Sequence, residues 1–135
     1  MFDTKFVIVV RDDLAMWQKL NVTAFLSTGV SAAKPDIIGM PYQDADGNLY
    51  HPMSVQPVIV LAANADKLMK IHQRTLQRQV QSSLYIEEMF STGHDSANRA
   101  VFKEHSPENA KVVGIAFHTD KKIADKISKG AKMHG

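Results

Sequence analysis

The segment VIVVRDDLAMWQK, residues 7–19, joins an uninterrupted apolar run to three adjacent charged residues. A β-branched run of this kind is typical of a strand that is covered on both faces, as in a parallel sheet. We therefore predict a strand over residues 5–10, followed by a helix whose first turn begins at Leu14 and whose N-cap is Asp12 or Asp13. Arg11 and Asp13 then stand at the strand exit, where they either anchor an ion pair or bind an anionic ligand.

The predicted helix after this strand is apolar around much of its circumference. Its apolar or small positions continue through Leu20, Val22 and Phe25 to Leu26. A helix that lacks a broad polar face is expected to be heavily buried. Gly29 is the predicted interruption near its end.

The rest of the chain alternates between further strands and helices. Two apolar runs predict buried strands over residues 57–61 and 111–119, and a short strand is predicted over 84–86. Turn residues between 33 and 56, centred on Asp46-Gly47, predict a small hairpin with strands over 37–42 and 48–51. Helices are predicted over 65–81, capped by Asn64 or Asp66, over 96–104, and over 121–129, capped by Asp120 and closed by Gly130.

This order predicts a three-layer α/β/α fold with a four-stranded mixed sheet and a hairpin insertion, in a single domain over residues 1–135. The chain is 44% hydrophobic and 22% charged, as is usual for a globular protein. We expect a cytoplasmic protein that does not cross a membrane, because no apolar run approaches ~18 residues and no secretory signal precedes the first strand. The chain contains no cysteine, which excludes disulfides, thiol nucleophiles and Cys-based metal sites, and no motif predicts a cofactor or a metal.

A polar loop, TGHDSANR at residues 92–99, follows the predicted strand over 84–86. His94 and Asp95 are the strongest general-base candidates in the chain, because histidine titrates near neutral pH and a carboxylate can orient it or activate water. Asn98 and Arg99 would then polarise the substrate. The alternative is a structural turn in which Asp95 caps the next helix. We expect this loop to meet Arg11 at one sheet edge, with a further contribution from residues 118–120.

Two helices carry basic residues at helical spacing. Such stripes are usually solvated faces, although they could also follow an RNA backbone, which is bound through cations. The net charge of +2 is low for a protein dedicated to nucleic acid. The stripes consist of Lys67, Lys70, Arg74 and Arg78, and of Lys121, Lys122, Lys126 and Lys129.

The opening of the chain resembles that of the type II peptidyl-tRNA hydrolases. In that family the pattern is roughly VVRxDLxMGKGKxAAQxAH, and here it stands as VVRDDLAMWQKLNVTAFLSTG, from Val9 to Gly29. The VVGIAF strand before an acidic helix cap agrees as well. The chain is still more similar to an uncharacterised bacterial domain family of the same fold superfamily, which shares the block SLYIEEMFSTGHDSANR, from Ser83 to Arg99.

The resemblance implies the fold described above, often as a homodimer, and it implies ester hydrolysis. Residue by residue, Lys19 matches a lysine of the hydrolase site and Asp95 matches its aspartate, while Arg11 and Asp13 match the strand-exit pair. Thr28 or Ser27 falls near the place of the hydrolase's histidine, depending on a one-residue gap. Trp17 replaces the first glycine of the MGKGK element, and no histidine stands in the matching helix.

Three functions therefore stay open. The first is a hydrolase acting on a small molecule, with Lys19 supplying positive charge and His94 or Asp95 activating water. The second is a non-catalytic module that binds a small ligand or regulates a partner. The third is a divergent peptidyl-tRNA hydrolase. In each case Arg11, Asp13, Thr28, Asn98 and Arg99 are the predicted ligand contacts, because one fold supports many functions and the site must decide.

Overall fold

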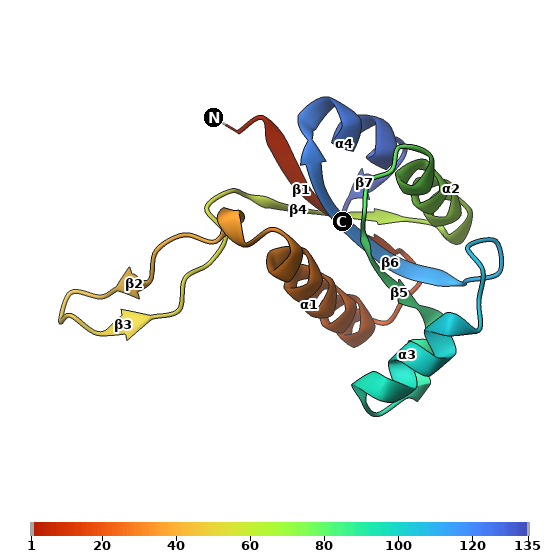
Figure 1. The fold of residues 1–135 in the computed structure, drawn as a ribbon, viewed down its shortest axis with the longest axis horizontal. Helices are drawn as coiled ribbons and strands as arrows, with labels where there is room; N and C mark the ends of the chain where they lie inside the picture. The colour runs from red at the N-terminus through yellow and green to blue at the C-terminus, as the bar shows by residue number, and fades with distance from the viewer. Residues whose placement is uncertain (1, 135) are drawn as a thin grey trace.

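A five-stranded mixed sheet forms the centre of the computed structural model, which describes residues 2–134 (Figure 1). Its order is β5-β6-β1-β4-β7, and a separate two-stranded hairpin is formed by β2 and β3. The strands are β1 (Thr4–Arg11), β2 (Tyr42–Gln43), β3 (Leu49–Tyr50), β4 (Val58–Ala63), β5 (Ser83–Ile86), β6 (Val112–Asp120) and β7 (Lys132–Met133). The helices are α1 (Met16–Ala33), α2 (Ala65–Gln77), α3 (Asp95–Lys103) and α4 (Lys121–Ser128), with short 3-10 helices η1 (Pro35–Ile37) and η2 (Glu87–Ser91).

The strand directions decide which loops share an edge. β1 and β4 are parallel, with Phe6 opposite Val58 and Arg11 opposite Ala63. β6 is antiparallel to both β1 and β5, so β5 runs in the same direction as β1. The segments that follow β1, β4 and β5 therefore leave the sheet at the same edge. The expected contribution from residues 118–120 is wrong, because Asp120 pairs with Thr4 at the opposite edge.

The sheet has a core on each face. On one face α1 packs against β1, β5 and β6, and its Val22, Leu26 and Val30 join Ile8 and Val10 of β1. On the other face α2 and α4 pack against β1 and β6, and Val7 and Val9 of β1 belong to this second core. Alternate β1 residues thus enter opposite cores, which explains its uninterrupted apolar run and confirms the helices on both sides of the sheet.

The predicted number of strands in the main sheet is wrong by one. β7 consists of only Lys132 and Met133, which pair with Ala62 and Leu61 of β4. Two residues have no periodicity that could mark a strand. Pairing with β4 alone gives this segment its conformation.

Three expectations for α1 are corrected. The helix begins at Met16, and the side chain of Gln18 accepts a hydrogen bond from the amide of Ala15 at 3.0 Å, so neither Asp12 nor Asp13 is its cap. Gly29 lies inside the helix, where a Cβ atom would overlap the hydroxyl of Ser83. The helix is also not heavily buried, because its outer face is open to solvent.

The other elements largely follow their local signals. The side chains of Asn64 and Asp120 cap α2 and α4 as predicted, and Gly130, with φ of +97°, ends the turn after α4. α2 is four residues shorter than expected. The hairpin forms with Gly47 in its turn, although its strands are only two residues each. No helix among residues 2–134 is long and apolar enough to cross a membrane.

Candidate functional site

A large cavity lies on the α1 side of the sheet, beside the strands that α1 does not cover. α1 packs over β1, β5 and β6, whereas β4 and β7 have no helix above them on this face. The resulting cavity has a volume of about 660 Å³. It is lined by Asp12, Met16, Lys19, Leu20, Thr23, Val60, Ala62, Ala63, Asn64, Lys67, Gly130, Lys132, Met133 and His134.

This cavity lies at the carboxyl ends of the two parallel strands. The amide of Asp12, after β1, donates to the carbonyl of Ala63 at the end of β4 at 2.9 Å. The chain then enters α2 through Asn64, whose side chain accepts from the amide of Lys67 at 2.8 Å. Ligands of open α/β sheets usually bind outside the carboxyl ends of parallel strands, so the position agrees with a binding site.

Three lysines reach the cavity from three different elements. Lys19 comes from α1, Lys67 from the first turn of α2, and Lys132 from β7. None of them forms an ion pair with any residue among 2–134. Asp12 is the one carboxylate in the lining among the described residues. The cavity therefore carries an excess of positive charge that the described part of the chain does not neutralise.

The turn after α4 makes room for one of these lysines. A Cβ atom at Gly130 would lie 2.8 Å from both Cε and Nζ of Lys67. The φ of +97° at Gly130 is also a conformation that L residues rarely adopt. Gly130 is thus required twice, by the backbone of the turn and by the path of the Lys67 side chain towards the cavity.

The floor of the cavity is apolar. Val60 and Ala62 of β4 form it, and Met16, Leu20 and Met133 stand around it. An apolar floor with a few polar groups at the rim is the usual composition of a small-molecule site. The arrangement suits a molecule with an apolar body and an anionic group.

Arg11 and Asp13 form an ion pair at the end of β1, outside the cavity lining. The Nε of Arg11 donates to Asp13 at 2.6 Å, and its NH1 donates to Glu87 of η2 at 2.9 Å. Burial would lower the pKa of Arg11, but these two hydrogen bonds outweigh it and raise that pKa above its ordinary value. The guanidinium thus already has two carboxylate partners, and it joins the end of β1 to the segment after β5.

The predicted catalytic loop has local hydrogen-bond partners. Nδ1 of His94 accepts from the amide of Ala97 at 3.3 Å, so His94, and not Asp95, is the N-cap of α3. Asp95 pairs with Arg99 one turn later at 2.7 Å, and both side chains are more than three-quarters exposed. Asn98 bonds to the hydroxyl of Thr92.

The structure brings only some of the predicted site residues together. Lys19 lines the cavity, but the lining includes no residue from 87–104, and so neither His94 nor Asp95. Thr28 lies outside it too and donates its hydroxyl to the carbonyl of Phe25 at 2.6 Å. Arg11 reaches Glu87 of η2, which precedes the predicted loop over 92–99, and its two ion pairs are with Asp13 and Glu87.

Sequence reasoning did not find most of the cavity lining. Lys67 was predicted to belong to a solvated stripe on α2, and Lys132 and His134 follow the last predicted helix. Asp12 was considered only as a cap. One feature of the sequence could have indicated this site, because Asp12 and Asn64 each directly follow one of the two parallel strands. Among residues 2–134 no group of three or more His, Asp or Glu residues could hold a metal ion.

Comparisons with known proteins agree with the observed fold. A solved structure of a protein of unknown function, Atu0240, from Agrobacterium tumefaciens strain C58 shares 60% sequence identity with this chain. The two structures have a TM-score of 0.98, with 100% of each chain covered. No curated protein matches the sequence significantly. A sequence model of DUF2000, described as a protein of unknown function, matches residues 4–135, and the chain therefore belongs to the DUF2000 family.

Proposed function

We propose that the protein binds a small organic anion in the cavity between α1 and the β4–β7 edge. The observation that carries this proposal is the convergence of three lysines on an apolar floor. Lys19, Lys67 and Lys132 have no ion-pair partner within residues 2–134. Cations at the edge of an apolar cavity favour a carboxylate or phosphate group attached to an apolar body. The apolar body would lie on Val60 and Ala62, with its charged group towards the lysines.

A set of naphthalene compounds tests this proposal by isothermal titration calorimetry. We expect 2-naphthoate and 2-naphthyl phosphate to bind, and 2-naphthylmethylamine not to bind. Lys67→Ala should weaken binding by about 10- to 100-fold, because a hydrogen bond to a charged group contributes about 1.5–3 kcal/mol. Lys70→Ala is the matched control, since Lys70 is exposed on the same helix and lies outside the cavity lining. Equal losses in the two variants, or binding of the amine, would contradict the proposal.

Hydrolysis of the bound molecule is the second candidate function. Asp12 supports it, because this carboxylate lines the cavity together with Lys19 and could activate water beside a bound ester. The resemblance instead implies Lys19 together with His94 or Asp95. Turnover of 2-naphthyl acetate and of peptidyl-tRNA by Asp12→Asn and Asp95→Asn distinguishes the two. Loss only in Asp12→Asn places the chemistry in the cavity, and loss only in Asp95→Asn supports the site implied by the resemblance.

We also propose that the fold is a variant of the type II peptidyl-tRNA hydrolase fold, in a cytoplasmic protein. The parallel β1–β4 pair, the antiparallel β6 and the order of α1, α2 and α4 support this, with the β2–β3 hairpin as an addition. The absence of cysteine suits a reducing compartment. Superposition on a type II hydrolase and cell fractionation test the two statements. A TM-score under 0.5 would reject the fold assignment.

A further inference from the structure

The outer face of α1 is unusually apolar for a surface helix. Of its eighteen residues only Lys19 is charged. Trp17, Leu20 and Phe25 are 62%, 65% and 53% exposed. A surface helix normally presents charged and polar residues on the face opposite the core. This face of α1 therefore has the composition of a contact surface.

The hairpin forms a second surface of the same kind. We use the term arm for residues 39–55, which project from the body beyond the carboxyl end of α1 (Figure 1). All the hydrogen bonds given for residues 40–52 are formed within the arm. At the base of the arm the amide of Gly39 donates to the carbonyl of Met53 at 3.0 Å. An isolated two-stranded hairpin is only marginally stable in water. The arm is therefore expected to lie on another surface.

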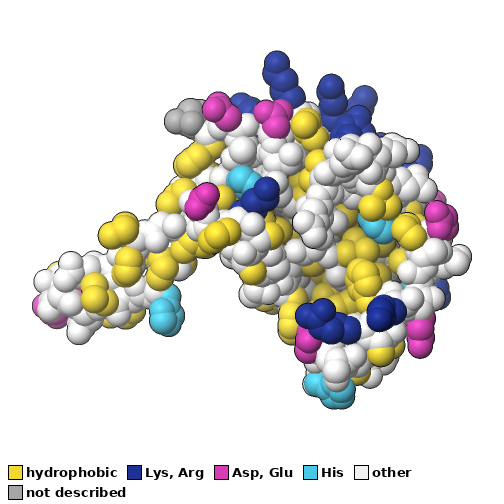
Figure 2. Space-filling model, viewed as in Figure 1, with side chains coloured by type: hydrophobic (Ala, Val, Ile, Leu, Met, Phe, Trp, Pro, Cys, Tyr) yellow, Lys and Arg dark blue, Asp and Glu magenta, His cyan; other side chains and the backbone are white. Residues whose placement is uncertain are grey.

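Most of the exposed apolar side chains of the protein belong to these two surfaces. Fifteen large apolar side chains among the described residues are at least 40% exposed, and ten of them lie on the arm or on α1. Figure 2 shows apolar side chains along the arm, away from the body. The arm contributes Met40, Tyr42, Leu49, Tyr50, Met53 and Val55.

The arm and α1 also match in length and in charge. From its base at residue 39 to its turn the arm extends about 25 Å at ~3.3 Å per residue, and the eighteen residues of α1 extend about 27 Å at ~1.5 Å per residue. The arm carries Asp44 and Asp46 at its tip. The first turn of α1 contains no acidic residue, and the amino end of a helix favours negative charge.

We propose that two copies of the chain form a two-fold dimer in which each arm lies along the outer face of the partner's α1. Because the arm starts at the carboxyl end of α1, two antiparallel copies place the base of each arm near the symmetry axis. Each acidic tip then reaches the amino end of the partner's α1, where the helix dipole favours negative charge. A single two-fold axis therefore buries both arms and both outer faces of α1, as in an isologous interface. An unrelated partner would need one complementary surface for the arm and another for α1.

Sedimentation of the ligand-free protein tests this proposal separately from ligand binding. We expect a particle of twice the 15.0 kDa chain mass at micromolar concentration. Leu49→Glu on the arm and Ala24→Glu on the outer face of α1 should each weaken dimerisation at least 10-fold, because either change buries a carboxylate in the interface. Leu76→Glu is the control, since Leu76 is 52% exposed on α2, away from both surfaces. Circular dichroism establishes that each variant is folded.

Cross-linking gives a second readout, because the chain contains no cysteine. We expect a mixture of the single variants Tyr50→Cys and Ala24→Cys to form an interchain disulfide on mild oxidation, in greater yield than Tyr50→Cys mixed with Leu76→Cys. A wild-type protein that stays monomeric at 100 μM would overturn the proposal. So would a dimer that withstands both glutamate substitutions and gives no excess of the expected cross-link.

Discussion

The two flanks of α1 differ in how closely side chains pack there, although both flanks lie on the same face of the sheet. On the β5 flank the ring of Phe90 contacts those of Trp17 and Tyr85, with centroids 6.0 and 5.3 Å away, and Phe25 contacts Tyr85 at 6.0 Å. The charged side chains there have partners. On the β4 flank a cavity of about 660 Å³ remains, and its lysines have no ion-pair partners among residues 2–134.

This difference separates residues that hold the structure from residues that are available for binding. Arg11 on the β5 flank is 16% exposed and bonds to two carboxylates, so its charge is used within the chain. Lys19 on the β4 flank lines a cavity and has no such use. Removing a charged group that stabilises the fold should lower the free energy of unfolding. Removing one that binds a ligand should change this free energy little when the ligand is absent.

Gly114 affects the packing on both flanks, because its lack of a side chain allows α1 to approach the sheet closely. A Cβ atom there would lie 2.5 Å from Cγ1 of Val22 and 2.9 Å from Cδ1 of Leu26, so Gly114→Ala should destabilise the protein by about 1–3 kcal/mol. Urea unfolding measures this change. Gly93→Ala is the control and should change stability by less than about 0.5 kcal/mol, because nothing lies within 4 Å of its Cβ position. Equal effects would show that α1 does not depend on this close contact.

The flanks themselves can be compared through Phe90 and Lys19. Phe90→Ala removes the ring that joins Trp17 to Tyr85 and should lower the free energy of unfolding by about 2 kcal/mol, because the side chain is half-buried. Lys19→Ala should change it by less than about 0.5 kcal/mol. Thermal unfolding of both variants without ligand gives the comparison. A Lys19→Ala loss as large as that of Phe90→Ala would make the cavity lysine a structural residue.

The ion pairs of the β5 flank should themselves differ in strength. Arg11→Met should cost about 1 kcal/mol, a value reduced because Asp13 and Glu87 are 64% and 45% exposed. Arg99→Met, which breaks the exposed pair with Asp95, should destabilise the protein less than Arg11→Met, because solvent screens an exposed ion pair. Chemical denaturation of the two variants under identical salt decides this. If Arg99→Met is the more harmful change, α3 is held by more than its local hydrogen bonds.

Local sequence patterns predicted the elements that are determined locally. The buried runs of β1 and β6 and the caps at Asn64 and Asp120 follow from residue type and spacing, and all are observed. β4 forms where a strand was predicted, but the expectation that it is buried is wrong, because Val60 and Ala62 line the open cavity. The apolar composition of α1 predicted a heavily buried helix, and this prediction is wrong. The chain itself buries only the stripe formed by Val22, Leu26 and Val30.

The cavity could not be predicted in the same way, because its residues come from separate elements. Lys132 reaches it only because β7 pairs with β4, and this pairing has no signal in a two-residue strand. His94 shows the opposite difficulty. A histidine in a polar loop suits a helix cap and a general base equally well, and the 3.3 Å contact between its Nδ1 and the amide of Ala97 is a fact of geometry alone.

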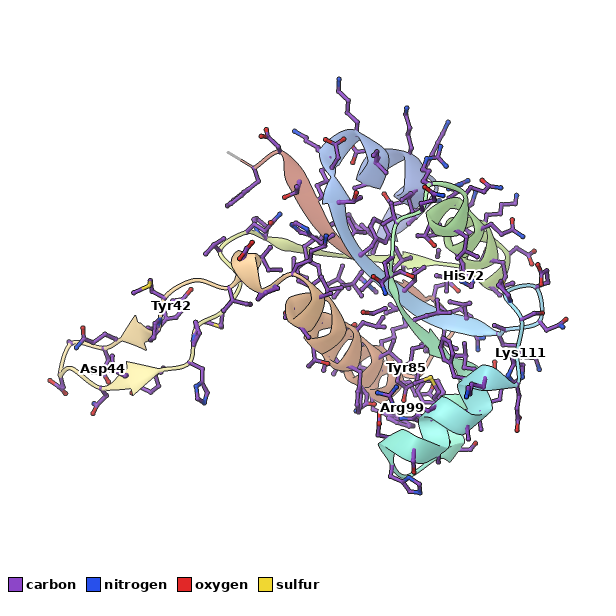
Figure 3. The ribbon with its side chains drawn as sticks, viewed as in Figure 1. Tyr42, Asp44, His72, Tyr85, Arg99 and Lys111 are labelled. Atoms are coloured by element: carbon purple, nitrogen blue, oxygen red, sulfur yellow. The ribbon has the colours of Figure 1, made fainter. Side chains whose placement is uncertain are left out.

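A last and smaller effect concerns His72 of α2, on the opposite face of the sheet, which Figure 3 labels. It is 6% exposed, its Nδ1 has no hydrogen-bond partner among the described residues, and burial lowers its pKa below the ordinary 6.5. Below pH 6.5 the unfolded chain therefore binds a proton that the folded protein resists, so stability falls as the pH falls through this range.

His72→Leu should remove this part of the pH dependence. We expect its unfolding free energy to fall less than that of the wild type between pH 7.5 and 5.5, as measured by urea titration at each pH. An unchanged slope in His72→Leu would mean that the imidazole is protonated as easily in the folded protein as in the unfolded chain.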